Sequence, residues 1–144
     1  MSDSLILNRQ RKYRIQVSSL SRFLLRLSLR LRISDKECVV LLTNDRTIRR
    51  LNQRFRNKDK ATDVLSFPGS VSPDEGLSFE NDYLGDIIIS VERAQRQALA
   101  KRHNLERELR ILVIHGMLHL LGHDHEIDRG QMRRKELRLQ RELL

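Results

Sequence analysis

The stretch YLGDIIISV, residues 83–91, predicts a β-strand with three consecutive isoleucines at its centre. β-Branched side chains favour extended backbone, and a short apolar run bounded by polar segments is typical of a buried strand. Ser90 ends this strand and offers a cap to a helix expected over about 91–102. The junction separates a first part of strands and helices from a last part that is helical throughout, and it therefore decides the fold class.

Working outward from this junction, the apolar pattern predicts three more strands and four more helices. The strands are expected over residues 5–7, 37–43 and 64–67. The helices are expected over about 18–31, 45–55, 104–121 and 128–143. This order predicts an α/β or α+β fold with a small mixed sheet of about four strands and about five helices, forming a single domain over residues 1–144. The order of strands within the sheet does not follow from the sequence.

The predicted helices carry apolar residues at helical spacing and polar residues at their ends. The stripe on the first helix consists of Leu20, Phe23, Leu24, Leu27 and Leu31. On the second helix the residues expected to face inward are Ile48, Leu51 and Phe55. The last helix carries, among many charges, Met132, Leu137 and Leu139. The expected caps are Asn44 or Asp45 for the second helix and Asn104 for the fourth, which Gly122 ends.

The composition is that of a globular protein without a membrane partner. Hydrophobic residues make up 39% of the 144 residues, and no apolar run approaches the roughly 18 uncharged residues of a membrane span. Residues 1–4 lack the basic-then-apolar order of a signal peptide, so we expect a soluble, cytoplasmic protein. Cys38 is the only cysteine, which excludes an intrachain disulfide, and its apolar surroundings predict a buried thiol.

The net charge of +9 is unevenly distributed along the chain. Residues 61–92 contain no lysine or arginine and seven acidic residues, which leaves 28 basic and 12 acidic residues elsewhere, a net charge of +16. Such an excess favours a polyanion such as nucleic acid as partner, although a merely basic, soluble protein has the same composition. Within the acidic window, residues 70–82 are expected to form a loop. Asp63 and Asp86 adjoin apolar strands and are expected to be held by structural hydrogen bonds.

Four of the five histidines lie in HGMLHLLGHDHE, residues 115–126. His115 and His119 are four residues apart, so a helix presents them side by side. Gly122 lets the chain leave the helix, and His125 can then fold back toward the pair. Three neutral imidazoles with an open fourth position predict a catalytic zinc site at the end of a helix, although nickel or copper would also bind there. His123 is the alternative third ligand, because it continues the four-residue step.

The same histidine spacing occurs in metzincin peptidases, in which a glutamate after the first histidine acts as general base. Gly116 occupies that position here, which argues against peptidase chemistry. The basic segment 54–60 is a candidate helper, because a guanidinium binds phosphate and stabilises charge that develops on it. The same segment also fits a solvated charge run, which is the usual role of such loops. Asp124 is expected to act as a partner of the metal ligands or a proton acceptor, or else as a turn residue.

These residues together resemble the YbeY family of bacterial endoribonucleases, which act in rRNA maturation. The central signature is similar to LN at 51–52 through Arg56 and then TDVLSFP at 62–68. Further similar segments are LGDI at 84–87, HGMLHLLGHDH at 115–125, and Met132 with Glu136. The sequence departs from the family pattern at His123, which is commonly tyrosine, and at Ala61, which is commonly proline.

The resemblance implies a single α/β domain that binds zinc, or a similar divalent metal such as nickel, on His115, His119 and His125. It further implies that Arg56 is functionally important and that the protein cleaves single-stranded RNA. The implied role is processing of ribosomal RNA, chiefly the 3′ end of the small-subunit RNA, and ribosome quality control. The ribosome or its proteins would then be partners, whereas the oligomeric state is not implied.

Three functions are therefore compared. The first is a metal-dependent endoribonuclease with His115 and Arg56 at its catalytic centre. The second is a non-catalytic ribosome assembly factor whose metal is structural. The third is a zinc peptidase-like hydrolase, favoured only by the histidine spacing. The sequence does not distinguish water from the RNA 2′-hydroxyl as the attacking group.

Overall fold

The computed structural model describes residues 4–69, 82–124 and 126–144. The four strands are β1 (Leu5–Asn8), β2 (Glu37–Thr43), β3 (Val64–Pro68) and β4 (Tyr83–Ser90). The five helices are α1 (Val17–Arg30), α2 (Asp45–Arg56), α3 (Val91–Lys101), α4 (Leu105–Leu120) and α5 (Gln131–Leu143). The predicted sequence of strands and helices is therefore confirmed over the part of the chain that the structure describes.

The strands form one mixed sheet in the order β1-β2-β4-β3. β1 is parallel to β2 and β2 is parallel to β4, whereas β3 runs antiparallel to β4. The isoleucine run of β4 is thus central, with Ile87 opposite Val40 on one side and opposite Ser66 on the other. β3 forms an edge of the sheet, and this edge becomes important for the candidate site.

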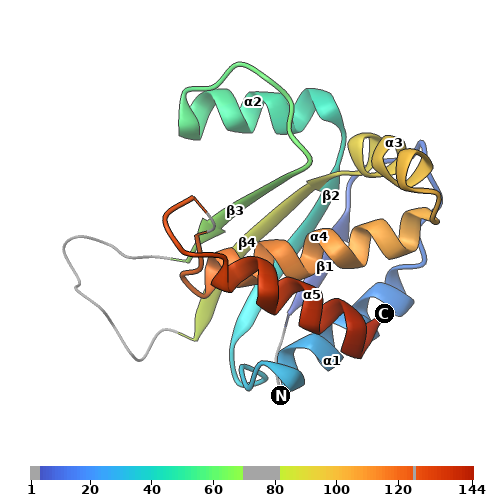
Figure 1. Cartoon of the computed structure of the whole chain (residues 1–144). Coiled ribbons are helices and arrows are strands. Elements are labelled where there is room, and N and C mark those ends of the chain that lie inside the picture. The colour runs from blue at the N-terminus through green and yellow to red at the C-terminus, as the bar shows by residue number, and fades with distance from the viewer. Residues whose placement is uncertain (1–3, 70–81, 125) are drawn as a thin grey trace.

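The alternation of side chains along β4 divides the core between the two faces of the sheet. Ile87 and Ile89 point into the main core, which also contains buried residues of α1, α4 and α5. Ile88 points to the other face, where it packs with Ile48 of α2 and Leu65 of β3. Figure 1 shows the result, with α2 on one side of the sheet and α1, α4 and α5 on the other.

The predicted helix caps are confirmed. The side chain of Asn44 accepts a hydrogen bond from the backbone N–H of Thr47 (2.8 Å), and that of Asn104 accepts one from Arg107 (2.8 Å). Ser90 accepts one from Arg93 (3.3 Å), so the strand-to-helix junction is also as expected. Each cap satisfies a backbone donor that the first turn of a helix leaves without an intrahelical partner.

Two side chains predicted to be apolar contacts are exposed instead. Phe55, at the end of α2, is 59% exposed, and the buried residue on that turn is Asn52, whose side-chain amide donates to the Lys60 carbonyl (2.9 Å). On α5, Leu137 is 38% exposed while Glu136 is buried. In each helix a polar residue is buried while the apolar one is exposed, because the polar side chain finds a partner outside its own helix.

The remaining expectations have mixed outcomes. α5 begins at Gln131 rather than near residue 128, because the carboxylate of Asp128 accepts the backbone N–H groups of Gly130 (2.8 Å) and Met132 (3.0 Å) before the first turn.

Cys38 is buried, and burial raises the pKa of its thiol, in agreement with a structural role. The loop expected at 70–82 lies outside the described residues except for Asp82. No helix in the described ranges has the length and apolarity to cross a bilayer.

Gly85 in β4 and Gly122 after α4 allow the close packing of the sheet to be tested. Both have positive φ, +138° and +93°, but a Cβ at Gly85 would lie 2.6 Å from the backbone nitrogen of Gly69, whereas one at Gly122 would meet nothing within 4 Å. We expect Gly85→Ala to lower the free energy of unfolding by more than about 3 kcal/mol, because a backbone clash adds to the strain. Gly122→Ala should cost only about 1–2 kcal/mol. Urea unfolding in the presence of chelator measures both, and equal losses would contradict the packing.

Candidate functional site

α4 places His115 and His119 together on its less buried side. The neighbouring positions Ile114, Met117 and Leu118 are fully buried and fix the rotation of the helix. The two imidazole rings are 4.7 Å apart between centroids and inclined by 68°, and their Nε2 atoms are 3.1 Å apart. The predicted side-by-side arrangement of these two histidines is therefore present.

This separation fits a shared metal ion. Two imidazole nitrogens on one tetrahedral zinc, each about 2.0–2.1 Å from the metal, are roughly 3.3 Å apart. The pair thus needs little rearrangement to bind a cation. His125, the predicted third ligand, lies outside the described residues. Within the described ranges no group of three potential ligand side chains is assembled, so the full ligand set stays a prediction.

The alternative ligand His123 is described, and it does not border the cavity that His115 and His119 line. Its backbone N–H bonds to the Leu118 carbonyl (3.0 Å), and Gly122 before it adopts a φ of +93°. The chain has therefore left the helix before residue 123, which breaks the four-residue step that favoured this histidine.

Glu136 of α5 orients His115. Its carboxylate, which is buried, is hydrogen-bonded to Nδ1 of His115, and Arg133 lies 3.6 Å from the other carboxylate oxygen. Because Nδ1–H donates to the carboxylate, Nε2, which lies 3.1 Å from Nε2 of His119, carries the lone pair and can act as a metal ligand. In the sequence, Glu136 stands out only as one of the residues that resemble the YbeY family, and no role is predicted for it. The signal for its role was a charged residue on the buried stripe between Met132 and Leu139.

Arg56, the last residue of α2, reaches the same site from the other face of the sheet. Its Nη2 donates a hydrogen bond to the Ser66 carbonyl of the edge strand β3 (3.1 Å). The guanidinium, which has five N–H donors, keeps donors for other partners. Arg56 lines a cavity of about 290 Å³, which His115 and His119 also line. The cavity is lined by Arg56, Val64, Ser66, His115, His119, Asp124 and Glu126.

Ser66 was not predicted as a site residue, although it connects two walls of the cavity. Its hydroxyl, buried on β3, donates to the Gly116 carbonyl of α4 (3.3 Å). Gly116 itself lies against β4, because a Cβ there would be 2.7 Å from Cγ2 of Ile87. The glutamate of a metzincin peptidase would therefore have no room at this position.

Asp124 is a turn residue, as one of its two expectations had it, while its role toward the metal ligands stays a prediction. Its carboxylate closes the turn after α4 by accepting the backbone N–H of Glu126 (2.9 Å), and the same residue lines the cavity. Asp63 is held by the backbone N–H of Val64 (2.8 Å) and the side chain of Gln97 (3.2 Å). Asp86 is held by the Tyr83 hydroxyl, so the expected structural hydrogen bonds of these two aspartates are present.

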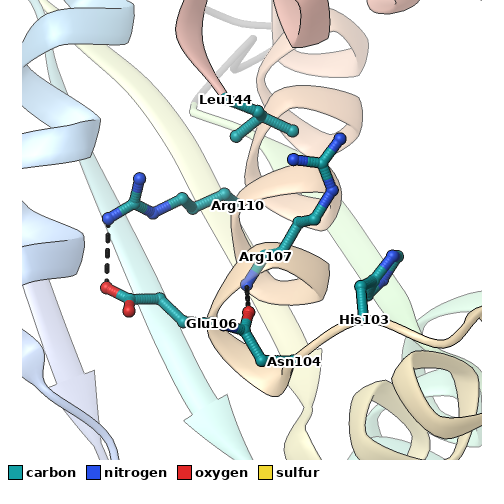
Figure 2. Close-up of a pocket in the computed structure, with 6 residues that line it drawn as sticks. All are labelled: His103, Asn104, Glu106, Arg107, Arg110 and Leu144. Carbon is teal, nitrogen blue, oxygen red and sulfur yellow. Dashed lines mark hydrogen bonds and ion pairs between the residues drawn. The ribbon is translucent and has the colours of Figure 1, made fainter.

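A second cavity of about 410 Å³ lies beside the first turn of α4, away from the histidine pair. Figure 2 shows its lining residues, with the carboxylate of Glu106 paired to Arg110 (3.0 Å) and Asn104 capping the helix at Arg107. His103, on its border, is bonded to the fully buried Glu108 (2.7 Å). These polar groups stabilise the start of the helix, and the imidazole pair and Arg56 do not line this cavity.

Comparisons with known proteins agree with the sequence motifs. A family model described as Endoribonuclease YbeY matches residues 5–144. The Endoribonuclease YbeY of Nautilia profundicola is 49% identical over 104 residues, which cover 72% of this chain and 70% of the relative. That of Heliobacterium modesticaldum is 50% identical over 121 residues, which cover 76% and 70% of the two chains. The solution structure of TM1509 from Thermotoga maritima has a TM-score of 0.65 and 29% identity, and the match covers 99% of this chain and 89% of that chain.

The contact between Glu136 and His115 predicts a specific loss of metal affinity. Glu136→Gln removes the carboxylate charge that fixes the His115 ring, and we expect zinc affinity to fall about 10–100-fold. Competition with a chromophoric chelator measures the affinity, and ¹⁵N NMR of the imidazole reports which nitrogen carries the proton. Glu142→Gln is the matched control, because Glu142 lies on the same helix and pairs with Arg30. Equal zinc affinity of the two variants would contradict the orienting role.

Proposed function

The chain belongs to the Endoribonuclease YbeY family, and from this membership and the cavity beside His115 we propose that it cleaves single-stranded RNA with a bound metal ion. One observation carries the proposal beyond the family name. Arg56 and the imidazole pair, from opposite faces of the sheet, line the same cavity. A phosphate-binding cation next to two metal-ligating nitrogens is suited to phosphodiester chemistry.

The proposed roles follow from the donor sets. His115 and His119, with His125 as the third ligand, would hold one divalent ion, with zinc as the first choice and nickel as an alternative. The ion supplies positive charge and Lewis acidity beside the scissile phosphate. Glu136 keeps the His115 Nε2 available by holding the proton on Nδ1. The guanidinium of Arg56 binds the phosphate and stabilises the negative charge that develops on it.

The basic surface next to the cavity supports a polyanionic substrate. On α2 the exposed arginines are Arg46, Arg49, Arg50, Arg54 and Arg56. Lys58 and Lys60 follow on the loop and are also exposed. Each phosphate that they neutralise releases counterions, so affinity for RNA should be high and should fall with salt.

We further propose that the substrate is ribosomal RNA, chiefly the 3′ end of the small-subunit RNA, and that the protein associates with ribosomes or their proteins and contributes to ribosome quality control. The activity then belongs in the cytoplasm, where ribosomes are assembled. Residues 1–144 would act as one functional domain, because α1, α4 and α5 share the main core with the sheet. The family resemblance and the basic surface support these statements.

Cleavage by point variants tests the catalytic assignment. We expect Arg56→Ala to slow cutting of a 5′-labelled single-stranded rRNA fragment about 100–1,000-fold, the loss typical when one charge-stabilising donor is removed. His115→Ala should abolish cutting. Arg26→Ala is the control, because Arg26 is an exposed arginine on α1 and does not line the cavity.

Unchanged cutting by both Arg56→Ala and His115→Ala would show that the chemistry occurs elsewhere. If these variants fold, bind ribosomes and still support rRNA maturation, the assembly-factor function takes precedence. The product ends also identify the attacking group, because a 2′,3′-cyclic phosphate excludes direct attack by water.

Metal removal is an independent test. Dialysis against chelator should abolish cutting by the wild-type protein, and added Zn²⁺ should restore it. Ni²⁺ should also restore cutting if any divalent ion that three imidazoles bind supports the reaction. His115→Ala should not be restored by either ion. Undiminished activity after complete metal removal, verified by elemental analysis, would contradict the metal-dependent mechanism.

A further inference from the structure

Phe55 is an exposed aromatic residue in a chain that has few of them. The sequence contains four phenylalanines, two tyrosines and no tryptophan. The pattern of α2 predicts that Phe55 is buried, yet it is 59% exposed, whereas Phe23 is 1% exposed. A ring exposed to this extent gains only part of the stabilisation that full burial would give, and its exposed surface can contact a ligand.

The surroundings of Phe55 connect it to the cavity. Its ring meets Phe67 of β3 edge-to-face, with centroids 5.4 Å apart and an interplanar angle of 63°. The guanidinium carbon of Arg54 lies 5.4 Å from the centre of the Phe55 ring. That of Arg56 lies 5.8 Å from the Phe67 ring while Arg56 bonds to Ser66. Aromatic rings and guanidinium groups thus lead without interruption from Phe55 to the rim of the cavity.

The end of α2 that carries Phe55 is held firmly. Asn57 adopts a left-handed conformation with φ of 58°, its N–H donates to the Gln53 carbonyl (3.1 Å), and the N–H of Lys58 donates to the Asn52 carbonyl (3.2 Å). The loop beyond is tied to the helix by an ion pair between Arg49 and Asp59 (2.8 Å). Binding of a ligand to the ring therefore loses little conformational entropy of the protein.

We propose that Phe55 is a stacking subsite for one unpaired nucleobase of the RNA, positioned next to the phosphate that Arg56 binds. The inference deepens the proposed function and rests on it. Every base has a π-face that stacks on an aromatic ring, and Arg54 next to Phe55 and Arg56 next to Phe67 supply cations for the phosphate backbone. A base inside a duplex is already stacked and paired, so this subsite selects single strands.

The charge around the ring favours RNA over a protein partner. The exposed residues beside Phe55 on the helix and the following loop include Arg54, Arg56, Lys58 and Lys60. A protein interface centred on one ring would have to desolvate several of these cations, whereas a nucleic-acid strand neutralises them. The occupant is therefore a nucleotide with its phosphates.

Binding of a strand that resists cleavage tests the subsite in the metal-loaded protein. The probe is a short, fluorescein-labelled 2′-O-methyl oligonucleotide, read by anisotropy, with its integrity verified on a gel. We expect Phe55→Ala to weaken binding about 5–150-fold, the range that loss of one stacked base produces. Phe55→Trp should retain the affinity and Phe55→Leu should not, because only tryptophan keeps a π-face.

Two controls separate stacking from general effects. Leu99→Ala removes a 68% exposed apolar side chain from α3, which does not border the cavity, and should leave binding unchanged. A duplex probe should bind wild-type and Phe55→Ala alike. A further set of probes lacks one base each, at successive positions. At one of these positions the missing base should lower the affinity of the wild-type protein but should not lower that of Phe55→Ala any further.

The outcomes for the subsite and for the proposed function are distinguishable. If the wild-type protein cuts RNA but Phe55→Ala and Phe55→Leu bind the probe as tightly as wild type, the subsite is overturned and the nuclease stands. If the protein binds the strand through Phe55 but never cuts RNA, the subsite stands and the nuclease proposal fails. Equal weakening by Phe55→Trp and Phe55→Ala would also overturn stacking.

Discussion

The close approach of α4 to the sheet at Gly116 is the constraint on which the site depends. A Cβ at this residue would lie 2.7 Å from Cγ2 of Ile87, so the helix can rest against β4 at this depth only with glycine there. The same approach brings the Gly116 carbonyl to the Ser66 hydroxyl of β3. His115, the residue before it, is thereby set beside the edge strand, and His119 follows one turn later. A wider spacing would leave the imidazoles too far from Arg56 to share a cavity.

Much of the fold follows from local rules, and these parts were predictable. Side chains at Asn44, Ser90 and Asn104 cap the three helices that they precede, because a capping hydrogen bond involves only residues three apart. The paired histidines likewise need only the geometry of one helix. His125 lies outside the described residues, so its place in the ligand set is still a prediction.

Other parts depend on contacts between distant segments, which no local pattern contains. Phe55 and Leu137 have the apolar character of core residues but are exposed, whereas Asn52 and Glu136 on the same helices are buried because they find polar partners. The carboxylate that orients His115 comes from α5, beyond the turn that ends α4. The order β1-β2-β4-β3 is also a non-local property, because it depends on which apolar strands pair in the assembled sheet.

The hydrogen bond from Arg56 to Ser66 has a consequence for the solubility of the protein. β3 is an edge strand, and an edge with unpaired backbone groups is a template for pairing with another chain. Arg56 occupies one of these carbonyls with a charged, hydrated group, as natural edge strands commonly do to discourage self-association. The residue proposed for phosphate chemistry thus also blocks one backbone acceptor on this edge, and replacing it would leave the Ser66 carbonyl open to pairing with another chain.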